Sequence, residues 1–162
     1  MNYERHQLSA SWPDMAEEDF VALKDSIAYS GLIEPITLFE GQILDGWHRY
    51  SACIQTETAP KFEEFLGSDP AQYVRDKHTR RPLTLTQRLT CIALMSRWKP
   101  RGGNQSAVPA DCSSSKDIAK AAGGGVRSAE HVKEAITKGA PELIQAMKAG
   151  KVGAEKAAAI AK

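Results

Sequence analysis

With 162 residues, the chain has room for one domain or two small ones, and its 42% hydrophobic residues are enough to build a core. It contains no apolar run long enough to span a bilayer, its N-terminus is too polar for a signal peptide, and its three cysteines, Cys53, Cys91 and Cys112, show no paired metal-ligand spacing. A reduced, cytoplasmic protein with no membrane partner follows most simply, and this is the localisation that we predict.

The net charge of +1 is the sum of an acidic and a basic half of the chain. Residues 1–70 contain 4 Lys/Arg and 13 Asp/Glu, whereas residues 71–162 contain 17 Lys/Arg and 7 Asp/Glu. Because affinity for nucleic acid rests largely on the neutralisation of phosphates by such cations, this division suggests that only the second half docks on DNA or RNA. The alternative is that the basic residues form an ordinary solvated face.

The first half mixes helical and extended patterns, which predicts a small α/β domain over residues 1–82. Acidic residues from Glu17 and apolar residues at helical spacing, ending at Gly31, predict the first helix. A turn at Glu40–Gly41 separates two strands, and Asp69 caps a later helix. In chain order, we expect a strand at 7–10, a helix at 17–30, strands at 35–39 and 42–44, a helix at 47–55, a strand at 61–65 and a helix from residue 70.

Residues 83–162 have a helical pattern throughout, so the predicted fold class is α+β, with an all-helical second domain. Thr84 or Thr86 caps its first helix, and a mobile linker is expected near residues 99–115. Short helices at 115–122 and 128–136 follow, joined by a turn at 123–127. The apolar spacing lets these two helices cross over a small core, as in a helix-turn-helix motif, although an ordinary helical hairpin has the same pattern. Further helices begin at Pro141 and Val152.

In a helix-turn-helix protein, the second helix enters the major groove of DNA and its early residues meet base edges. This predicts a double-stranded DNA partner, with a homodimer as one arrangement. The three consecutive glycines, 123–125, predict a longer and looser turn than usual. The expected groove residues are Arg127, Ser128 and His131, and the expected phosphate contacts are Lys116, Lys120 and Lys133.

The junction at Asp45-Gly46-Trp47-His48-Arg49 predicts a strand, a sharp turn and the start of a helix. The first N–H groups of a helix lack intrahelical partners and carry partial positive charge, so such a junction can bind an anion. Gly46 allows close approach of a ligand, Arg49 can fork onto a phosphate, and His48 adds a third donor. The alternative is that Gly46 only makes a turn, while His48 and Arg49 face water.

The sequence DGWHRYSA at residues 45–52 resembles the Gly-x-x-Arg-x-x-Ala box of the ParB/sulfiredoxin superfamily, and its Asp-Gly-x-His-Arg form is similar to ParB-like nuclease domains. It also resembles the phosphate box of sulfiredoxin, but Trp47 replaces the nucleophilic cysteine, which excludes that activity. Residues 76–84 fall where the family has Glu-Asn-x-x-Arg followed by Leu-Thr, and there Arg80 and the Leu83-Thr84 ending match. The resemblance extends roughly from Gln7 to the C-terminus.

The resemblance implies a ParB/sulfiredoxin-like domain followed by a helix-turn-helix domain, as in plasmid or phage ParB-like proteins. Such a protein would bind DNA in plasmid or phage maintenance, partition or transcription regulation. Its first domain would bind a nucleoside triphosphate, CTP or ATP, with Mg²⁺. Asp76 would hold the metal ion, although Lys77 in the next position cannot be a ligand for it. The phosphate-binding residues would be Gly46, His48, Arg49, Lys77 and Arg80.

The resemblance also allows an enzyme, either a ParB-like metal-dependent nuclease or a nucleotide hydrolase or phosphotransferase. In that case, Asp45 or Glu34 would act as general base or metal ligand and His48 as the acid/base group, while Arg49 would stabilise charge that develops in the transition state. The sequence lacks a dense carboxylate cluster, which disfavours a two-metal nuclease mechanism.

Overall fold

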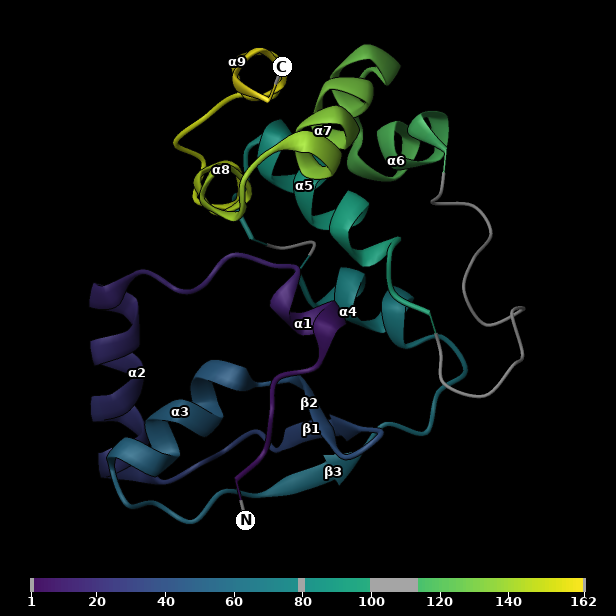
Figure 1. The fold of residues 1–162 in the computed structure, drawn as a ribbon. Helices are drawn as coiled ribbons and strands as arrows, with labels where there is room; N and C mark the ends of the chain where they lie inside the picture. Colours follow the sequence, from purple (N-terminus) through teal and green to yellow (C-terminus); the bar gives the residue numbers. More distant parts are fainter. Residues whose placement is uncertain (1, 79–80, 100–113, 162) are drawn as a thin grey trace. The chain divides into compact units, whose positions relative to one another are not determined.

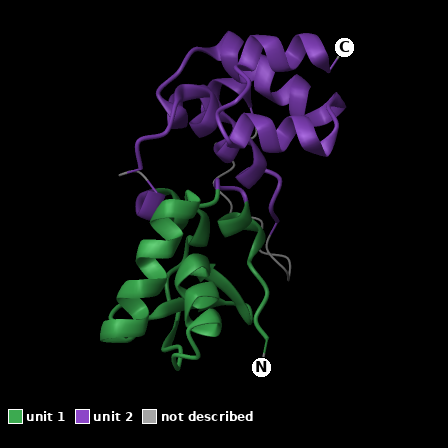
Figure 2. Cartoon of the chain, turned by 90° about the vertical axis from the view of Figure 1, so that its left-hand side faces the viewer, with its two compact units in different colours: residues 1–10, 14–75 green, residues 11–13, 76–162 purple. Residues whose placement is uncertain are grey.

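The computed structural model describes residues 2–78, 81–99 and 114–161 (Figure 1). It is an α+β protein whose chain divides into two compact units, residues 1–10 with 14–75 and residues 11–13 with 76–162 (Figure 2). None of the described helices is both long and apolar enough to cross a bilayer. The predicted linker near residues 99–115 lies largely outside the described residues.

The first unit contains a small mixed sheet in the order β2-β1-β3, with β2 antiparallel and β3 parallel to β1. Glu40 and Gly41 both adopt positive φ angles, 51° and 75°, which suits the tight hairpin between β1 and β2. This turn, the strands and the helices after residue 17 confirm the predicted pattern. The elements are α1 (Gln7–Ala10), α2 (Glu17–Ser30), β1 (Ile36–Phe39), β2 (Gln42–Asp45), α3 (Trp47–Gln55), β3 (Phe62–Glu64) and α4 (Pro70–His78), which crosses into the second unit.

The strand predicted at residues 7–10 is wrong, because the short helix α1 occupies those residues. Extended pairing occurs just before them, where Ile43 N–H donates to Glu4 O (2.8 Å) and His6 N–H donates to Ile43 O (2.9 Å). His6 Nδ1 then accepts a hydrogen bond from Leu8 N–H (3.2 Å), and this local bond turns the chain into a helix. Burial lowers the pKa of His6, which favours the neutral ring that such an acceptor requires.

One hydrophobic core joins the sheet to α3 and the end of α2. Figure 1 shows α3 between α2 and the sheet, in agreement with contacts of α3 to both α2 and β1. Cys53 is part of this core, and burial raises the pKa of its thiol. The core residues are Ile27, Leu32, Ile36, Leu38, Ile43, Tyr50, Ala52 and Cys53.

The second unit is mostly helical, and its helices share a single core. Its first helix, α5, begins after Thr84, whose hydroxyl accepts from Gln87 N–H while the Gln87 side chain accepts from Thr84 N–H. Of the two threonines predicted as caps, Thr84 is therefore the one used. Helices α5, α6 and α7 contact one another, and α8 and α9 contact α7. The helices are α5 (Leu85–Met95), α6 (Ser115–Ala122), α7 (Val126–Lys138), α8 (Pro141–Lys148) and α9 (Ala154–Ile160).

The turn between α6 and α7 is shorter and tighter than predicted. Gly123 ends α6 in the left-handed region (φ 68°), and Gly125 already caps α7, which begins at Val126 rather than Ser128. Gly124 N–H donates to Ala119 O (2.8 Å), a bond typical of a tight helix end. A Cβ on Gly124 would lie 2.6 Å from Leu85 Cδ1, so this glycine lets the turn pack directly on α5.

Candidate functional site

The junction between β2 and α3 has the backbone geometry of an anion site. Gly46 is the N-cap of α3 and has φ 91° and ψ 21°, a left-handed conformation that glycine adopts without strain. Glycine has no side chain with which to cap the helix, so the positive end of the α3 dipole is not neutralised from that position. The backbone at the junction has the turn that the sequence predicts.

Arg49 is held over this helix start by two carboxylates. Its Nη2 lies 2.8 Å from Asp45 Oδ2, and its Nη1 lies 2.9 Å from Glu34 Oε2 and donates to Glu34 O (3.3 Å). The guanidinium rests on Gly46, since a Cβ at that position would lie 3.0 Å from Nη2. A phosphate that binds Arg49 must therefore compete with carboxylates. Glu34 is the weaker competitor, because its side chain is 76% exposed and that of Asp45 only 18%.

His48 faces away from this group of residues. Its Nε2 accepts a hydrogen bond from Met15 N–H (3.1 Å), which requires that nitrogen to be unprotonated. The same nitrogen lies 3.5 Å from Asp14 Oδ1, a contact that is an ion pair only for a protonated ring. Asp14 Oδ1 is also paired with Arg5 Nη1, at 2.6 Å.

His48 and Arg49 also line different cavities. His48 lines one of about 420 Å³ with Arg5 and Trp47, whereas Arg49 lines one of about 300 Å³ with Glu34 and apolar residues of α2 and the chain that follows it. The structure thus brings Gly46, Arg49 and the two carboxylates together and separates His48 from them. Adjacent positions on a helix point about 100° apart, which is the reason for the separation.

The second phosphate box is described only in part. Asp76 and Lys77 are exposed at the end of α4 and belong to the second unit, whereas Arg80 lies outside the described residues. The part of the chain that the structure describes holds no group of three or more His, Cys, Asp or Glu side chains that could bind a metal ion.

The residues predicted to contact DNA lie on the polar side of α6 and α7. The apolar face of α7 is buried in the core, whereas Arg127 is exposed in its first turn, and Ser128, His131 and Lys133 are partly exposed. Lys116 and Lys120 are exposed four residues apart on α6, so both lie on one face of that helix. The buried residues of α7 are Ala129, Val132, Ala135 and Ile136.

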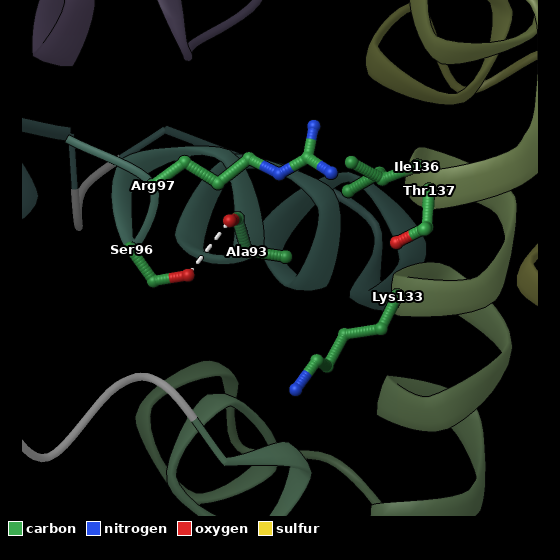
Figure 3. Close-up of a pocket in the computed structure, with 6 residues that line it drawn as sticks. All are labelled: Ala93, Ser96, Arg97, Lys133, Ile136 and Thr137. Carbon is green, nitrogen blue, oxygen red and sulfur yellow. Dashed lines mark hydrogen bonds between the residues drawn. The ribbon is translucent and has the colours of Figure 1, made fainter.

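Arg97 and Lys133 both line a cleft between the end of α5 and α7, and Arg97 is not among the residues predicted from the sequence (Figure 3). The cleft has a volume of about 220 Å³. No local pattern marks Arg97, because it follows the last turn of α5 and its neighbour comes from a distant helix. The lining residues are Ala93, Ser96, Arg97, Lys133, Ile136 and Thr137.

Comparisons of this chain with protein-family models, with curated proteins and with solved structures find no significant match. The resemblance to the ParB/sulfiredoxin superfamily thus stays a prediction that rests on the residues of its boxes.

Proposed function

We propose that the protein binds duplex DNA through its second unit, as a helix-turn-helix protein of the ParB-like type that acts in plasmid or phage maintenance, partition or transcription regulation. One observation carries this proposal: α6 and α7 are joined by a tight glycine turn, rest on α5, and expose Arg127 in the first turn of α7. The family part of the proposal depends on the sequence boxes alone.

In this arrangement, α7 is the helix that enters the major groove, which is wide enough to admit one. Its buried residues fix it to the core, so the exposed stripe that begins at Arg127 faces the DNA. A guanidinium can bond two acceptors on the edge of a guanine. Lys116 and Lys120 on α6 supply cations for the phosphates beside the groove.

The test is a binding measurement on a duplex selected from a random-sequence pool by the unaltered protein. We expect Arg127→Ala to cost about 1–3 kcal/mol of binding free energy and to relax the base preference at one position. Arg127→Lys should keep binding to random duplexes but lose that preference, since it retains the charge without the fork. Lys24→Ala, in the first unit, is the control. Failure of the unaltered protein to bind any duplex would refute the proposal.

A second proposal is that the first unit binds the phosphates of CTP or ATP at the start of α3. The left-handed Gly46, the guanidinium that lies on it and the adjacent cavity of about 300 Å³ favour this site. Isothermal titration with CTP, ATP and GTP tests it, and no heat with any of the three would refute it. We do not propose the nuclease or phosphotransferase alternative, because Asp45 and Glu34, its base or metal-ligand residues, contact Arg49.

A further inference from the structure

We infer that the cleft between the end of α5 and α7 is a subsite for one phosphate of the DNA backbone, held by Arg97 and Lys133. This inference rests on the proposed DNA binding and deepens it, because it adds a contact outside α6 and the exposed stripe of α7. It concerns the phosphodiester backbone and carries no base recognition.

The cleft has the shape and the donors for a small anion. Figure 3 shows the Arg97 side chain running from the end of α5 towards α7 along one side of the cleft, while Lys133 extends from α7 on its other side. Ala93 and Ile136 form an apolar part of the lining, which reduces the competition of water for the two cations. A guanidinium presents parallel N–H donors that match two oxygens of one phosphate, and an ammonium adds a point charge.

The side chains that line the cleft attract an anion, whereas the nearby C-terminal end of α5 does not. The C-terminus of α5 carries partial negative charge, and Ser96 Oγ donates to Ala93 O (2.8 Å). On the α7 side, the Glu134 carboxylate is paired with Lys138 at 2.9 Å. Thr137, exposed on the rim, carries a hydroxyl that can donate to an anion.

The position of the cleft along α7 suits a backbone contact. Lys133 follows Arg127 by six residues, or about 9 Å along a helix axis that rises 1.5 Å per residue. It also lies on a flank of α7, between the buried Ile136 and the exposed Thr137. If the first turn of α7 reads bases in a groove about 12 Å wide, its later turns reach the edge of that groove, where the phosphates lie.

The experiment compares Arg97→Gln, Lys133→Gln and the control Lys24→Gln in the first unit, each in the full chain and with folding checked by circular dichroism. Binding to the selected duplex and to a random duplex is measured over a range of salt concentrations. We expect Arg97→Gln and Lys133→Gln each to weaken both complexes by the same factor and to reduce the salt slope by about 1. Arg97→Lys should keep the slope, because it keeps the charge.

The outcomes separate this inference from the proposed function. Unchanged slopes for Arg97→Gln and Lys133→Gln, in a protein whose binding still depends on Arg127, would overturn the inference alone. A loss restricted to the selected duplex would assign these residues to base contacts and also overturn it. A dependence seen only with duplex RNA would replace the DNA assignment. If the unaltered protein bound no duplex at all, the proposed function and the inference would both fall.

Discussion

Among single residues, Arg49 decides whether the first unit can hold a phosphate. Its position beside Gly46 follows from local sequence, because both belong to one strand-to-helix junction. Its pairing with Glu34 does not, since Glu34 comes from the chain before β1 and only the folded unit brings the two side chains within 2.9 Å. The sequence thus predicted the cation at this site but missed its competitor.

Removal of that competitor should strengthen phosphate binding. An exposed ion pair contributes about 0.2–1 kcal/mol, so Glu34→Gln should tighten CTP or ATP binding by up to about fivefold, measured by isothermal titration. Arg49→Ala should abolish the binding. Glu18→Gln, on the exposed face of α2, removes the same charge away from Arg49 and serves as the control. Equal effects of Glu34→Gln and Glu18→Gln would show that only the general charge of the unit matters.

At the scale of elements, local signals placed most helices and strands correctly. Gly31 ends α2, and Asp69 Oδ1 accepts from Gln72 N–H (2.8 Å) at the start of α4, both as predicted. The two errors have non-local or side-chain causes. The bond from Leu8 N–H to His6 turned an expected strand into a helix, and the packing of Gly124 on Leu85 tightened a turn that a run of glycines alone would leave loose.

The cap of α5 gives a prediction at this scale. Thr84 Oγ1 accepts from Gln87 N–H (3.3 Å), and Gln87 Oε1 accepts from Thr84 N–H (2.9 Å), so Thr84→Ala removes half of a reciprocal pair. We expect it to lower the free energy of unfolding by about 0.5–2 kcal/mol in urea titrations. Thr86→Ala, two residues later in the same helix, leaves the cap intact and should cost less. The interpretation of the cap fails if Thr86→Ala costs as much.

For the whole molecule, the sequence shows that the first half is acidic and the second half basic. It does not show which basic side chains come together in the fold. The sequence gives Lys133 a place on the second helix of the pair, but only the fold brings Arg97 to the same cleft. The sequence therefore predicts the two helices of the candidate DNA surface and their exposed residues. It does not predict that the surface extends to Arg97 at the end of α5. The reason is physical, because contacts between distant segments depend on how the core packs.

The division of charge also predicts how binding responds to salt. A protein of net charge +1 that attracted DNA as a whole would show almost no salt dependence. If the second half binds alone, Lys116, Lys120 and Lys133 give a log–log slope of about −2.7, and Arg97 brings it to about −3.6. Fluorescence anisotropy at several salt concentrations measures this slope, with Lys24→Gln in the first unit as a control that should leave it unchanged. A slope close to zero would mean that counterion release does not drive the complex, and that the basic half is only a solvated surface.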